Sequence, residues 1–236
     1  EDTQTTNGYI IEGSIDSSAD NMVVKILQLE DNKEILIDSD TIKNGKITLK
    51  GTVESPDIYY ITIPGIYGNM PIILENEKMS ITFYKDSLTK SLVKGSQEND
   101  LLKIYHDDSE VLRTKNTQLG QRFRKASETK DSLKMAEVRI EFENILKTVN
   151  NKHLELIKSN TNLVTSAAIL ESMLRSKQIT NKETEPIFNT FSKNVLDSKF
   201  GKSINELLSV SSTEIGDIAP NFTAPNPEGK LVSLND

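Results

Sequence analysis

The hydrophobic pattern of this chain changes its period once, at Gly95-Ser96. Before this point apolar and polar residues alternate, which is the period of a β-strand; after it apolar residues recur every three or four positions, as in a helix. One element cannot satisfy both periods. The sequence therefore predicts an α+β chain, with a β-rich N-terminal part followed by an all-α helical part.

Short runs rich in β-branched and aromatic residues fill the first part and predict strands. The runs lie at residues 9–15, 22–29, 35–37, 46–53, 59–63, 70–74 and 79–84. Asn44-Gly45 gives the sharpest turn signal, because a type I′ hairpin needs a positive φ at both central positions. Strands of this number and spacing predict an antiparallel β-sandwich or a partly open barrel.

The second part carries signals for the beginnings of helices. Ser96 is expected to be an N-cap, with the acidic residues Glu98 and Asp100 in the first turn, where the helix dipole favours them. Thr180 and Glu183 fit a capping box that opens a later helix. We therefore expect a β domain over 1–95, a helical domain or connector over 96–210, and over 211–236 a linker that leads into a further domain.

Composition narrows the possible functions. The chain has no cysteine, which excludes disulfides, thiolate metal sites and cysteine catalysis within these residues. Residues 1–95 carry 9 Lys/Arg against 15 Asp/Glu, and the whole chain has a net charge of −7, so we expect no nucleic-acid partner. No apolar run approaches the ~20 residues of a membrane helix. No nucleotide-binding or hydrolase motif is present, and we expect no catalytic residue, metal or cofactor.

One group of side chains could suggest a metal site. His106-Asp107-Asp108 and Glu110 are close in sequence, but neighbouring residues on a helix point about 100° apart, so a solvated acidic turn is favoured. His153 lies on an apolar helical stripe and is expected to be a core-edge histidine with a satisfied ring nitrogen.

Two pairs of acidic residues could suggest hydrolytic chemistry. Asp38 and Asp40 share one face of a strand, and Glu75 and Glu77 flank a predicted turn. Edge-strand charge and turn formation explain them more simply than a pair of catalytic carboxylates.

Two other clusters are candidates for contact with a partner. The loop 65–68 is expected to be a hairpin loop, with Tyr67 and Met70 forming a contact surface if it is functional. The basic cluster 121–125 is expected to be solvated surface near a helix end.

The last residues contain an ordered set of small, proline and aromatic residues. Seven of them form the pattern: Gly216, Ala219, Pro220, Phe222, Gly229, Lys230 and Leu234. This pattern resembles the first segment of thioredoxin-fold proteins of the thiol–disulfide oxidoreductase and peroxiredoxin-like superfamily, with Asn221 where aspartate is usual. The resemblance implies that these residues are structural, and that a thioredoxin-like domain with its Cys-x-x-Cys site would continue beyond residue 236.

The rest of the chain has a looser set of matching features. These are Gly13, Asp38-Ser39, Asn44-Gly45-Lys46, Gly51, Pro56, Leu74-Glu75-Asn76, Gly95-Ser96 and Asn99. They resemble the N-terminal domain of unknown function that precedes thioredoxin domains in envelope proteins of Bacteroidetes. The resemblance implies export to the periplasmic side of the cell envelope, often with a lipid anchor on a cysteine before Glu1.

Two functions from different classes remain open. The first is a non-catalytic accessory region that positions its own thioredoxin-like domain, with binding of a client envelope protein or homodimerisation as further roles. The alternative is a stand-alone envelope module that binds a peptide or glycan and has no redox role.

Overall fold

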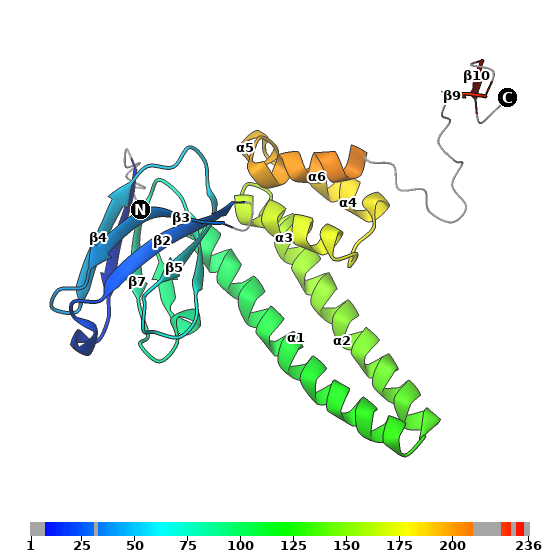
Figure 1. Ribbon diagram of the computed structural model, residues 1–236, viewed down its shortest axis with the longest axis horizontal. Coiled ribbons are helices and arrows are strands. Elements are labelled where there is room, and N and C mark those ends of the chain that lie inside the picture. Colours follow the sequence, from blue (N-terminus) through cyan, green and yellow to red (C-terminus); the bar gives the residue numbers. More distant parts are fainter. Residues whose placement is uncertain (1–7, 31–32, 210–222, 228–229, 234–236) are drawn as a thin grey trace.

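The computed structural model describes residues 8–30, 33–209, 223–227 and 230–233. A β-sandwich is followed by helices (Figure 1), so the predicted α+β arrangement with a β-rich N-terminal part is confirmed. One sheet has the order β4-β1-β7-β8, formed by Lys46–Gly51, Tyr9–Ser14, Lys78–Thr82 and Leu92–Lys94. The other has the order β3-β2-β5-β6, formed by Lys33–Thr41, Val23–Glu30, Asp57–Thr62 and Met70–Leu74.

The strand pairing is antiparallel with one exception. β1 and β7 pair in parallel, with Ile11 opposite Met79, which the sequence pattern did not predict. Short 3-10 turns, η1 (Ser17–Ala19) and η2 (Leu88–Lys90), precede β2 and β8. A further antiparallel pair joins β9 (Thr223–Pro225) to β10 (Leu231–Ser233).

The turn between β3 and β4 carries the chain from one sheet to the other. Asn44 and Gly45 have φ values of 50° and 68°, so the predicted hairpin geometry is confirmed. The carboxylate of Asp20 accepts hydrogen bonds from both backbone N–H groups, at 3.1 Å and 2.8 Å. This anchors the crossing between the sheets.

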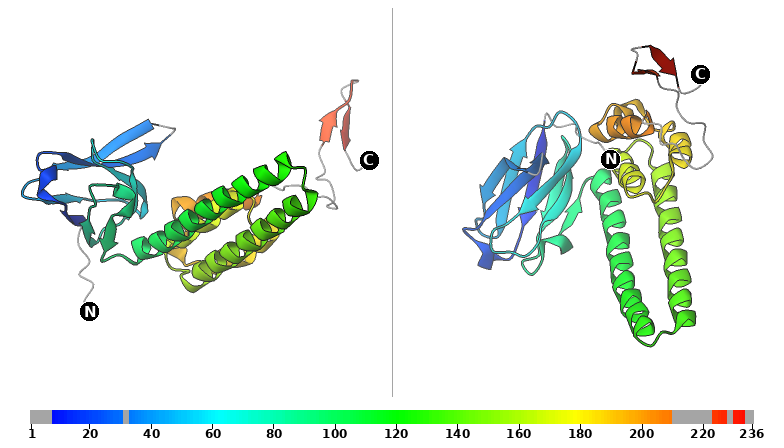
Figure 2. Two further views of the ribbon diagram at one scale, coloured as in Figure 1. Left: turned by 90° about the horizontal axis from the view of Figure 1, so that it is seen from below. Right: turned by 45° about the vertical axis from the view of Figure 1, so that its right-hand side comes forward.

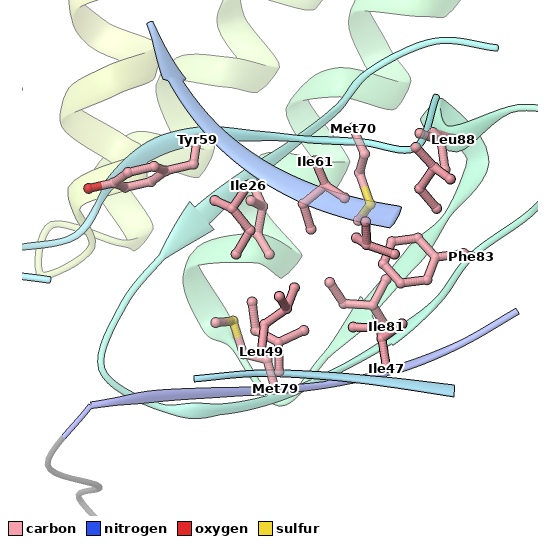
Figure 3. Close-up of a cluster of buried hydrophobic side chains, with 14 of the residues drawn as sticks. Ile26, Ile47, Leu49, Tyr59, Ile61, Met70, Met79, Ile81, Phe83 and Leu88 are labelled. Atoms are coloured by element: carbon pink, nitrogen blue, oxygen red, sulfur yellow. The ribbon is translucent and has the colours of Figure 1, made fainter. Parts of the chain in front are cut away.

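The inner faces of the two sheets form the core of the sandwich. Ile26 and Ile61 from one sheet face Leu49 and Ile81 from the other, and all four are almost fully buried (Figure 3). Burying a side chain of this size stabilises the fold by about 1.5–3 kcal/mol. The alternation of buried and exposed positions in β4, β5 and β7 is the predicted period-two pattern.

The helices form a long hairpin and a compact group at its base (Figures 1 and 2). The hairpin consists of α1 (Gln97–Glu128) and α2 (Ser132–Ser159); the group consists of α3 (Val164–Arg175), α4 (Asn181–Phe188), α5 (Lys193–Leu196) and α6 (Lys199–Ser209). Ser96 caps α1 by accepting a hydrogen bond from the N–H of Asn99 at 3.1 Å, as predicted. The capping box predicted at Thr180 and Glu183 is also present, at the start of α4. None of the helices in the described ranges is long and apolar enough to cross a bilayer.

Candidate interaction site at the junction of the sandwich and the helices

The first turn of α1 is joined to the sandwich by a buried amide. The Oδ1 atom of Asn99 accepts from the N–H of Ile73 at 2.9 Å, and its Nδ2 donates to the carbonyl of Ile73 at 2.8 Å. Ile73 lies in β6, an edge strand, so Asn99 takes the place of a neighbouring strand there. Both polar groups of one strand residue are thereby satisfied by a helix.

The residue before Asn99 joins α1 to α3. The carboxylate of Glu98 accepts from the N–H groups of Val164 and Thr165, at 2.7 Å and 2.8 Å. Leu163, the residue at the N-cap position of α3, has no side-chain acceptor of its own, so Glu98 supplies the cap from another helix. Glu98 is buried, and its negative charge also complements the dipole of α3.

Two further polar contacts cross the same junction. Ser96 donates to the Oε1 atom of Glu75 at 2.5 Å, and Lys199 of α6 pairs with buried Asp57 of β5 at 3.2 Å. Burial raises the pKa of Glu75, and the charge of Glu98 adds to this, while the hydrogen bond from Ser96 acts in the opposite direction. Glu75 thus belongs to the junction, and turn formation alone does not account for it.

The other predicted acidic pair lies at the edge of the sandwich. Asp40 accepts from the N–H of Thr48 at 2.9 Å, and Asp38 accepts from the N–H of Lys50 at 3.2 Å and from the hydroxyl of Tyr9 at 3.1 Å. Both carboxylates therefore bind the exposed edge of β4. The explanation from edge-strand charge agrees with these contacts.

A cavity of about 650 Å³ opens beside the junction. The sandwich contributes Tyr67, Thr89 and Lys90, and α1 contributes Lys103, His106, Asp107, Glu110 and Arg113. Tyr67 is 80% exposed in the loop 65–68, whereas Met70, which was expected to form a contact surface with it if the loop is functional, is buried in the sandwich core. Lys103 pairs with Asp107 at 2.6 Å and Arg113 with Glu110 at 2.7 Å, both within α1. The lining therefore combines one exposed aromatic ring with side chains of both charges.

The histidine–acidic cluster of α1 divides between two surfaces. His106 and Asp107 face the cavity, whereas Asp108 points to α2, where it pairs with Lys152 at 2.7 Å. In the ranges that the structure describes, no three His, Cys, Asp or Glu side chains form a group that could hold a metal ion. In the basic cluster, Arg122 pairs with Glu141 across the helical hairpin at 2.7 Å.

His153 is buried between α1 and α2, with 3% of its surface exposed. Its ring lies 4.7 Å from the ring of Tyr105, and its Nε2 atom is 3.6 Å from Oδ2 of Asp108, which is too long for a hydrogen bond. Among the described residues neither ring nitrogen has a hydrogen-bond partner. The prediction of a satisfied ring nitrogen is therefore wrong, whereas the burial of His153 agrees with the predicted position on the apolar stripe of its helix.

This histidine should make stability depend on pH. Burial lowers the pKa of His153, so the unfolded chain binds the proton more readily and stability falls as the pH drops through the ordinary value of about 6.5. We expect His153→Phe to lose less free energy of unfolding than the wild type between about pH 7.5 and pH 5.5. Urea denaturation at both pH values measures this. His106→Gln, which changes the other histidine of the chain, should keep the wild-type dependence, and an unchanged dependence in His153→Phe would contradict the prediction.

The residues of the thioredoxin-like pattern are mostly beyond what the structure describes. Gly216, Ala219, Pro220, Phe222, Gly229 and Leu234 lie outside the described residues. Lys230 is described: its N–H donates to Oδ1 of Asn226 at 2.9 Å, and its carbonyl accepts from the N–H of Asn226 at 2.8 Å. It thus lies in the turn between β9 and β10.

Comparison with known proteins gives one match. Residues 9–102 match a family model described as a domain of unknown function, DUF4369. The matched range covers the sandwich and the first turn of α1, and so includes Ser96, Glu98 and Asn99. No curated protein and no solved structure matches the chain.

Proposed function

We propose that this chain is the non-catalytic N-terminal accessory region of an exported thioredoxin-like thiol–disulfide oxidoreductase, and that it positions the redox domain. The observation that carries this proposal is the junction. Asn99 fixes α1 to the sandwich, Glu98 fixes α1 to α3, and Lys199 links α6 to β5. A region that holds another domain in place requires such a stiff connection between its own parts. The pattern at residues 216–234 supports a thioredoxin-like domain as the one positioned.

In this proposal residues 1–236 and the thioredoxin-like domain after them have different roles. Disulfide exchange begins with attack by a thiolate, and these 236 residues contain no cysteine. The chemistry therefore belongs to the domain that follows, while this region orients that domain and offers surfaces to a client or a second copy. The proposed location is the periplasmic side of the cell envelope, with a lipid anchor before Glu1.

A longer protein tests the proposal directly. A protein extended beyond residue 236 by one thioredoxin-sized domain, about 100–150 residues, should reduce the disulfides of insulin. Residues 1–236 alone should give no turnover, and the longer protein with its paired cysteines replaced by serine should match them. A gene that continues without paired cysteines, or an inactive longer protein that contains them, would refute the redox role.

One observation favours the alternative of a stand-alone module that binds a peptide or glycan. The cavity of about 650 Å³ places an exposed tyrosine beside polar side chains. Aromatic rings that offer both an apolar face and a hydroxyl are common in binding sites of this kind. Absence of paired cysteines from the longer protein would select this alternative.

A further inference from the structure

One side of α1 is exposed along most of the helix. Because an α-helix has 3.6 residues per turn, a set of residues spaced three or four apart lies within about 40° of Val111 around the helix axis. All of them are exposed. They are Asp100, Ile104, Asp107, Val111, Lys115, Gln118 and Arg122, and we call them the α1 stripe.

The neighbours of α1 contact other sides of this helix. Asp108 pairs with Lys152 of α2 at 2.7 Å. Glu98 accepts from the first turn of α3, and Asn99 binds β6 of the sandwich. These three residues of α1 lie about 60–140° from Val111 around the helix axis. In the part of the chain that the structure describes, these contacts leave the α1 stripe uncovered.

The α1 stripe contains the large hydrophobic side chains that α1 exposes. These are Ile104 and Val111, and Val111 is 54% exposed. Ile140 of α2 is exposed too, and it lines a hollow of about 550 Å³ together with Lys115, so it belongs to the same face of the helical hairpin. Burial of this apolar surface against another molecule would favour association.

The charges of the α1 stripe have opposite signs at equal distances from Val111. Asp107 lies four residues before Val111 and Lys115 four residues after it; Asp100 and Arg122 lie eleven residues before and after it. α1 is one continuous helix, so these spacings correspond to about 6 Å and about 17 Å along its axis. A second, antiparallel α1 related by a two-fold axis at Val111 would therefore place Asp107 opposite Lys115, and Asp100 opposite Arg122. Each pair would occur twice.

Contacts within the chain leave these side chains available. Among the described residues, the side chains of Asp100 and Lys115 have no ion-pair partner. Asp107 pairs with Lys103 and Arg122 pairs with Glu141, but all four of these side chains are about half exposed. Exposed ion pairs contribute little to stability, so they compete weakly with pairs formed at an interface.

We propose that the α1 stripe is a docking surface for a second copy of this chain, with the two α1 helices antiparallel about a two-fold axis at Val111. The pattern of charge selects a copy, because α1 is its own complement in this register. The sandwich and α3–α6 lie at the base of the hairpin (Figures 1 and 2), so an antiparallel arrangement places them at opposite ends of the dimer. This inference does not depend on the redox role, because it rests only on the helical hairpin.

Reversal of the central charges tests the register. Asp107→Lys and Lys115→Glu each place like charges opposite each other twice in a dimer. Each variant alone should therefore self-associate at least about tenfold more weakly than the wild type in sedimentation equilibrium at low salt. A mixture of the two variants restores opposite charges at both contacts and should associate like the wild type. Arg124→Glu is the matched control, because Arg124 is exposed on α1 about 140° from Val111 and should leave association unchanged.

A single introduced cysteine tests the position of the two-fold axis. The natural chain has no cysteine, so any disulfide reports one contact. Val111→Cys should form a covalent dimer under mild oxidation, because both copies of residue 111 meet at the axis. Asn116→Cys, exposed and about 140° away around α1, should not. A wild type that remains monomeric, a mixture that associates no better than its separate variants, or equal cross-linking at both positions would each overturn the proposal.

Discussion

Replacing Glu98 by alanine should lower the free energy of unfolding by about 2–6 kcal/mol. The carboxylate is buried and is the side-chain acceptor for the N–H groups of Val164 and Thr165. Each buried donor left without a partner costs about 1–3 kcal/mol, and the alanine variant leaves two. Chemical denaturation monitored by circular dichroism measures the change.

Asp100→Ala is the matched control. Asp100 lies in the same first turn of α1 but is exposed, so its loss removes only a dipole interaction of about 0.3–1 kcal/mol. Glu98→Gln should fall between the two, because one amide oxygen can still accept a hydrogen bond. Equal effects of Glu98→Ala and Asp100→Ala would show that the contact with α3 contributes nothing.

Replacing Asn99 by alanine should lower the free energy of unfolding by about 2–6 kcal/mol and should also loosen β6 locally. The variant leaves the N–H and the carbonyl of Ile73 without their partner, in the buried second half of β6. We therefore expect faster amide hydrogen exchange at Ile73 in addition to the lower stability. Hydrogen-exchange NMR measures the first effect and denaturation the second.

An exposed asparagine on the same helix separates this effect from helix propensity. Asn116→Ala changes the same residue type at an exposed position further along α1. It should alter the free energy of unfolding by no more than about 0.5 kcal/mol. If Asn99→Ala leaves exchange at Ile73 unchanged, the strand is held by other contacts and the junction is not the anchor described above.

Local signals made much of the fold predictable. The change of period, the Asn44-Gly45 turn and the capping box at Thr180 each depend on residues within a few positions of one another. The parallel pairing of β1 with β7 depends on segments almost 70 residues apart, and no local pattern specifies which strand lies beside which. Such choices are made by packing of the whole sandwich.

The junction escaped prediction for the same reason. Asn99 binds a residue 26 positions away and Glu98 binds residues 66 and 67 positions away. In the sequence, Glu98 could be assigned only to the helix dipole. One signal was available: Glu98 lies three residues before Leu101, on the apolar side of the helix, where a carboxylate needs a buried partner. The cavity was predictable only in part. The sequence identifies loop 65–68 as a candidate contact surface, but it does not show that Tyr67 of this loop lies near His106 of α1.

Because the helical hairpin of α1 and α2 is long and begins at the junction, a small change of angle there displaces its far end much more than its base. With 32 residues, α1 is about 48 Å long, and its far end, beside α2, points away from both the sandwich and α3–α6 (Figures 1 and 2). A rotation of about 5° at Asn99 would move the far end by about 4 Å, given that length. A small change in the hydrogen bonds around Ile73 would therefore displace the far end of α1 by more than the diameter of a water molecule. The first turn of α1 would hardly move.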